Sequence, residues 1–108
     1  MSDPYMDILA HKLGELRYAE RLRILRHLAE VQSCTLQSIV EALGHQWDPS
    51  SAIAQAIRRH LRVLEEVGFV SHEREHDGKI PMDIYFFEKD MWRSFAGSLA
   101  LTMGAGSL

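Results

Sequence analysis

The segment from Ala52 to Phe86 constrains the fold most, because it reads as a long helix that runs into a charged β-hairpin. Apolar side chains recur at helical spacing on one side of this helix, at Ile53, Ile57, Leu61 and Leu64. Polar side chains recur on the opposite side, at Ser51, Gln55, Arg58, Arg59 and Arg62. Gly68 follows where a left-handed C-cap residue ends a helix. The sequence therefore predicts a helix with one buried face and one arginine-rich face.

Two strand-like segments follow at 69–74 and 82–88, and Asp77-Gly78 between them is a strong hairpin signal. A helix with an arginine-bearing face beside a β-ribbon is the layout of a winged helix-turn-helix. In that fold the helix enters the DNA major groove and the ribbon covers the neighbouring backbone. We expect one α+β domain over residues 1–108, mainly α. Its recognition helix is expected at about 49–67, its two-stranded β-hairpin wing at about 69–88, and its terminal helices at about 4–13 and 89–102.

Three segments resemble the ArsR/SmtB type of winged-helix transcriptional regulator: Arg21–Leu28, Ile39–Gly44 and Arg59–Val70. The third is the most specific, because a helix, a glycine stop and a strand fall within one short pattern. The resemblance implies a homodimeric DNA-binding regulator, a repressor, whose terminal helices pack about a two-fold axis. Between Gly44 and Arg59 the chain has several more residues than the family pattern. Either the turn is enlarged, or the recognition helix is longer at its N-terminal end.

Local signals define the remaining helices. Asp48 is expected to cap the fourth helix, with Pro49 at its first position. Thr35 is expected to cap a helix at 36–43 that Gly44 ends. A second helix at about 15–29 is expected to turn its leucines inward and its arginines mostly outward: Leu22, Leu25 and Leu28, and Arg21, Arg23 and Arg26. His60, beside the apolar row, is expected to pack between helices.

Two sets of residues are the candidate sites. The expected DNA contacts lie on the fourth helix and the hairpin: Ser51, Gln55, Arg58, Arg59, Arg62, Arg74 and Lys79. The alternative for the arginines is a solvated helix face with an Arg62–Glu66 pair. The expected dimer interface lies on the terminal helices: Tyr5, Ile8, Leu9, Leu13, Trp92, Phe95 and Leu99. The alternative is that these side chains only close the core of one chain.

Charge qualifies the DNA-binding hypothesis. Twelve Lys and Arg against fifteen Asp and Glu give a net charge of −3, whereas DNA-binding domains are often basic. Acidic residues also lie near the arginines, among them Glu73, Glu75 and Asp77. A winged-helix module that binds protein partners without strong DNA binding is therefore the alternative function. The absence of a signal peptide, of a membrane-spanning run and of a second cysteine favours a cytoplasmic protein.

Metal binding and catalysis are not expected. Metal-sensing members of the family carry Cys-x-Cys where this chain has Thr35 and Gln37. The last helix offers Asp90 and no histidine, and a closed ligand set around His72 and His76 is not visible. Cys34 reads as a small, partly buried residue. No nucleophile–base set or phosphate-binding glycine loop stands out, so we expect neither an enzyme nor a cofactor.

Overall fold

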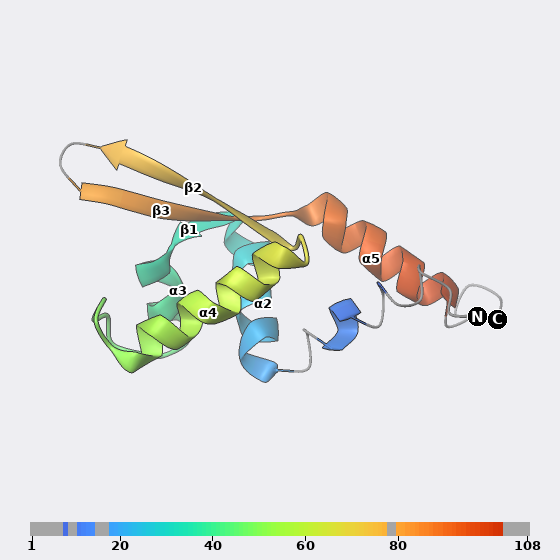
Figure 1. The fold of residues 1–108 in the computed structure, drawn as a ribbon, viewed down its shortest axis with the longest axis horizontal. Coiled ribbons are helices and arrows are strands. Elements are labelled where there is room, and N and C mark those ends of the chain that lie inside the picture. Colours follow the sequence, from blue (N-terminus) through green and yellow to red (C-terminus); the bar gives the residue numbers. More distant parts are fainter. Residues whose placement is uncertain (1–7, 9–10, 15–17, 78–79, 103–108) are drawn as a thin grey trace.

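The computed structural model describes residues 8, 11–14, 18–77 and 80–102. Its elements, in chain order, are α2 (Ala19–Val31), β1 (Ser33–Thr35), α3 (Leu36–Ala42), α4 (Ala52–Glu66), β2 (Val70–Asp77), β3 (Ile80–Phe87) and α5 (Lys89–Thr102) (Figure 1). Residues 8 and 11–14 are also helical, so this segment extends one residue past the expected range of about 4–13 and includes Gly14. No helix in these described ranges is long and apolar enough to cross a membrane.

Helices α2, α3 and α4 pack around one core beside an antiparallel sheet with the strand order β1-β3-β2. The β2–β3 hairpin projects from one end of the molecule and α5 from the other (Figure 1). The expected winged helix-turn-helix is therefore present, with α5 in the bounds predicted for it. The sheet has a third strand that was not predicted, since β1 pairs with β3 and places Cys34 opposite Tyr85.

Large apolar side chains from every layer meet in the core. The largest fully buried ones are Phe69, Ile24, Leu28, Ile39, Ile57, Leu61, Leu64 and Val40. Burying each removes apolar surface from water and contributes roughly 1.5–3 kcal/mol. The core thus holds α4 by its inner face and leaves its outer face free.

Two glycines end the helices of the helix-turn-helix in the same way. Gly44 has φ +87° and Gly68 has φ +89°, a conformation that costs glycine little. After α4, the amide of Gly68 donates to the carbonyl of Glu65 (3.0 Å) and that of Phe69 to the carbonyl of Leu64 (3.0 Å). This is the Schellman arrangement, which satisfies carbonyls at the helix end and turns the chain into β2.

The N-terminus of α4 corrects one prediction and decides between two alternatives. Ser51, not Asp48, is the N-cap, and its Oγ accepts a hydrogen bond from the amide of Ala54 (3.1 Å). The Asp48 carboxylate instead accepts from the amide and hydroxyl of Ser50, which holds Asp48 and Pro49 within the turn. The chain between α3 and α4, residues 43–51, is therefore an enlarged turn, and α4 begins only at Ala52.

Three predicted orientations are also wrong. Leu22 is 47% exposed and lies at the rim of an apolar pocket with Phe87 and Trp92. Arg21 is only 9% exposed, because its Nε donates to His60 Nδ1 (3.1 Å) and its guanidinium lies over the Tyr18 ring (4.4 Å). Ile53 is 41% exposed, since it lies in the first turn of α4, at the edge of the core. His60 does pack between helices, as predicted.

Candidate nucleic-acid interface

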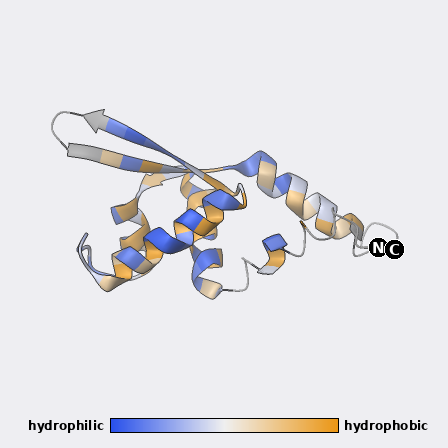
Figure 2. Ribbon diagram, in the orientation of Figure 1, coloured by the Kyte–Doolittle hydropathy of each residue, from blue (hydrophilic) through white to orange (hydrophobic). Residues whose placement is uncertain are grey.

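The outer face of α4 carries two of the exposed arginines among the predicted DNA contacts, Arg59 and Arg62. Gln55, Arg59 and Arg62 are exposed there, while Ala54, Ile57, Leu61 and Leu64 are buried on the opposite side. The ribbon of α4 accordingly alternates between strongly hydrophilic and hydrophobic residues (Figure 2). Within the described part of the chain, neither Arg59 nor Arg62 forms an ion pair, so the alternative Arg62–Glu66 pair is not seen. Their guanidinium groups are available to an anionic partner.

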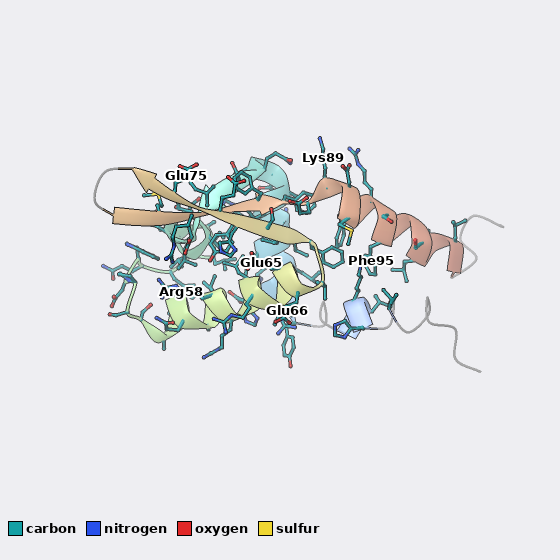
Figure 3. All side chains as sticks on the ribbon, turned by 45° about the horizontal axis from the view of Figure 1, so that its top comes forward. Arg58, Glu65, Glu66, Glu75, Lys89 and Phe95 are labelled. Atoms are coloured by element: carbon teal, nitrogen blue, oxygen red, sulfur yellow. The ribbon has the colours of Figure 1, made fainter. Side chains whose placement is uncertain are left out.

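Arg58 lies apart from the other two arginines. It is half-buried on the side of α4 that faces the hairpin (Figure 3). Its Nη1 donates to the carbonyl of Pro49 (3.4 Å), and the side-chain amide of Gln55 donates to the same oxygen (3.4 Å). These long hydrogen bonds connect α4 to the enlarged turn that precedes it.

The hairpin presents less free positive charge than the sequence suggests. Arg74 and Asp83 face each other across the strands, and Arg74 Nε donates to Asp83 Oδ1 (3.1 Å). This hydrogen bond and the charge of Asp83 raise the pKa of Arg74 above its usual value. Glu75 is exposed on the outer side of the hairpin (Figure 3). Lys79, the predicted contact at the tip, lies outside the described residues.

A polar contact fixes the hairpin relative to α4. His72 on β2 is hydrogen-bonded through Nδ1 to the Glu65 carboxylate on α4. The His72 ring also lies near that of Tyr85, with 5.6 Å between centroids. Burial is the main reason why the pKa of Tyr85 is raised. Tyr85 is thus a neutral phenol within the buried core cluster.

The described residues proposed for a dimer interface differ in how exposed they are within one chain. Ile8 and Leu13 are exposed by 54% and 45%, whereas Tyr5 and Leu9 lie outside the described residues. Phe95 is only 4% exposed in one chain, because its ring packs on Phe69 with 5.2 Å between centroids. Trp92 and Leu99 are half-buried against the core.

Thr35 and Gln37 stand where metal-sensing ArsR/SmtB regulators carry cysteines, and both have structural roles here. Thr35 Oγ1 accepts from the amide of Ser38 (3.2 Å) as the cap of α3, as predicted, and the Gln37 amide donates to Glu41 (2.9 Å). Among the described residues, no group of three or more His, Cys, Asp or Glu side chains is placed to hold a metal ion. Burial raises the pKa of Cys34, which keeps its sulfur as a thiol.

Sequence reasoning missed two features of this surface. The Arg74–Asp83 pair depends on the hairpin register, in which Asp77 pairs with Ile80. The Asp-Gly signal predicted a hairpin but not which residues pair across it. Assuming a two-residue loop and counting outwards along both strands would have placed Arg74 opposite Asp83. The pocket beside Arg58, lined by Trp47 and Met82, joins distant segments and has no local signal.

The fold is shared with solved structures of transcriptional regulators at low sequence identity. A possible transcriptional regulator from Methanosarcina mazei Go1 aligns with a TM-score of 0.58 and 13% identity over 94% of this chain and 83% of that one. A PadR family transcriptional regulator from Eggerthella lenta DSM 2243 aligns with a TM-score of 0.51 and 21% identity over 96% and 94%. The AntR antimony-specific transcriptional repressor aligns with a TM-score of 0.51 and 19% identity over 89% and 78%.

No curated protein matches the chain in a sequence search. A family model does match it: residues 22–82 fit the model of the ribonuclease R winged-helix domain, and this segment covers most of α2, the helix-turn-helix and most of the wing. The matched segment is more than half of the chain and coincides with the fold described above. The chain therefore belongs to the family of ribonuclease R winged-helix domains.

Proposed function

We propose that the protein is a sequence-specific DNA-binding transcriptional regulator that reads the major groove with the outer face of α4. The observation that carries this proposal is the pair of exposed arginines, Arg59 and Arg62, free of ion pairs in the described structure, on the face opposite the buried Ile57 and Leu61. Arginine makes bidentate hydrogen bonds to guanine and grips phosphate, so it suits either role in a groove. The fold shared with transcriptional regulators supports the proposal.

The finer parts of the proposal are a repressor of the ArsR/SmtB type, a homodimer, and Ser51, Gln55, Arg58, Arg74 and Lys79 as further contacts. Large apolar side chains exposed on the terminal helices support self-association, with Leu101 at 77% and Leu13 at 45%. A two-fold dimer would present two α4 helices to one duplex and double each contact. Because each arginine contact would occur twice, a chain with only twelve Lys and Arg could still bind one duplex firmly.

The DNA proposal is tested by fluorescence anisotropy with duplexes selected from a random library. Arg59→Ala should either flatten the salt dependence by about one unit, if it contacts phosphate, or lose ~1–3 kcal/mol at one base position. Arg26→Ala is the matched control, because it removes the same charge from α2, outside this face. Equal DNA affinities for the wild type, Arg59→Ala and Arg62→Ala would contradict the proposal.

Self-association needs its own test, because Phe95 is covered within one chain and is a poor probe of an interface. Leu101→Glu and Leu13→Glu place charges on the exposed apolar side of the terminal helices. Sedimentation should show a wild-type dimer and monomeric variants with unchanged circular dichroism. Ile53→Glu, at another exposed apolar site on α4, should remain a dimer. A wild type that sediments as a monomer would exclude the dimer.

A protein-binding module is the second candidate, and the acidic wing favours it. Glu73 and Glu75 are exposed on β2, and Asp83 neutralises Arg74. An acidic ribbon would repel DNA phosphate and suit a basic protein surface. If the selection recovers no duplex that binds the folded protein at low salt, this function is favoured over the first.

A further inference from the structure

The enlarged turn between α3 and α4 forms one wall of a pocket of about 320 Å³. The other walls are the start of α3, the side of α4 that carries Arg58, and strand β3 of the wing. This volume is at the lower end of the range for small-molecule sites, roughly 300–1,000 Å³. The pocket has both apolar and cationic lining, which defines the chemistry of a ligand.

Three apolar side chains supply surfaces suited to a flat ring. Trp47 lies half-buried in the enlarged turn and packs against the core cluster, so its position is fixed from behind. Met82 on β3 is 49% exposed, and Leu36 forms the floor with 7% exposure. Indole and thioether groups both make favourable contacts with aromatic rings.

Three of the polar side chains in the lining already have partners. Thr35 accepts the capping bond from Ser38, and the Gln37 amide donates to Glu41. Asp83 accepts from Arg74, which offsets its negative charge. The donors that remain on Thr35 and Gln37 are neutral, so they bind a carboxylate more weakly than a cationic group does.

Arg58 is the cationic group in this lining, and most of its donors are unused. Within the described structure its bond to the Pro49 carbonyl is long, at 3.4 Å, and engages one of five N–H donors. Arg58 lies between α4 and the hairpin (Figure 3) and lines the pocket. A guanidinium with free donors beside apolar walls matches a carboxylate carried by an aromatic ring.

We propose that this pocket binds a small aromatic carboxylate, with the ring between Trp47 and Met82 and the carboxylate on Arg58. The ligand regulates DNA binding, because a guanidinium held by a carboxylate no longer contacts phosphate. This regulatory role rests on the proposed DNA-binding function, whereas binding of the carboxylate does not.

Ligand binding is measured without DNA by fluorescence of the Trp92→Phe variant, in which Trp47 is the remaining tryptophan. The probes are benzoate and 2-naphthoate, each compared with its neutral amide. At least one carboxylate should change the fluorescence saturably. Its amide should bind about ten- to a hundredfold more weakly, as expected when a charge-assisted hydrogen bond is lost. Calorimetry on the wild type provides a second measurement that needs no substitution.

Arg58→Gln should lose this binding by a similar factor, whereas Arg59→Gln, the adjacent arginine on the outer face of α4, should keep it. Equal binding of acid and amide, full binding by Arg58→Gln, or no saturable binding of either acid would overturn the proposal. None of these results bears on whether Arg59 and Arg62 contact DNA. If a probe binds and leaves the DNA affinity unchanged, the regulatory role is wrong.

Discussion

Gly68 connects α4 to the wing, and replacing it with alanine tests how much its backbone conformation and close packing contribute to stability. Its φ of +89° lies in the left-handed region that alanine disfavours. A Cβ built on Gly68 would also lie 2.7 Å from Cε of Met91 on α5, too close for two carbon atoms. Gly44 is a natural control, because its φ is +87° and a Cβ there would meet no heavy atom within 4 Å.

The stability lost on substitution should differ between the two glycines by the cost of the contact with Met91, which only Gly68→Ala would make. Left-handed backbone costs alanine about 1–2 kcal/mol, and alanine stiffens the unfolded chain by about 0.4–1 kcal/mol, so Gly44→Ala should lose about 1 kcal/mol of stability. Gly68→Ala must in addition move the Met91 methyl, and an off-rotamer side chain costs about 0.5–1.5 kcal/mol. We therefore expect Gly68→Ala to lose about 2 kcal/mol.

Urea unfolding followed by circular dichroism measures both losses, since a chain of 108 residues is of a size that usually unfolds in two states. Met91→Ala, at a side chain 40% exposed, should be nearly neutral alone and should remove the excess loss of Gly68→Ala in the double variant. Equal losses at Gly44 and Gly68, or no recovery in the double variant, would refute this reasoning.

Three further predictions concern the core and the polar contacts. Leu61→Ala, at a fully buried site, should lower the free energy of unfolding in urea by about 2–5 kcal/mol, the usual range for such truncations. Burial and Arg21 lower the pKa of His60, so below about pH 6.5 the unfolded chain gains a proton that the folded chain resists. Stability should therefore fall as the pH is lowered through this range, and His60→Gln should reduce that dependence. Asp83→Asn should release Arg74 and steepen the salt dependence of DNA binding by about one unit; an unchanged slope would exclude Arg74 from the interface.

The sequence predicts well those elements whose signals are local. Helix α5, the hairpin, the Thr35 cap and the glycine stops at Gly44 and Gly68 all depend on residues within a few positions of one another. Propensity, capping and turn chemistry act over that range, so each element can be recognised without knowing its neighbours.

Features that depend on tertiary contacts could not be predicted in this way. Both Asp48 and Ser51 are good N-cap residues, and the choice of Ser51 follows from where α4 packs on the core. Arg21 is buried because His60, far along the chain, accepts its hydrogen bond. Strand β1 has three residues, too few for an alternating pattern, and exists through its pairing with β3.

The enlarged turn shows how such a contact shapes the candidate site. An extension of α4 would have added residues to the end of the helix that approaches DNA first. Instead, Ser51 caps α4 close to the point where its buried face begins at Ala54, and the additional residues leave the helix axis. They place Trp47 against the core and the Pro49 carbonyl within reach of Gln55 and Arg58. Among the described residues, Arg59 and Arg62 on the outer face form no hydrogen bond with the turn, whereas Arg58 is hydrogen-bonded to it. A change in the turn should thus affect Arg58 and the pocket before it affects the outer face, and shortening the turn around Trp47 should abolish carboxylate binding while leaving the Arg59 contribution to DNA affinity in place.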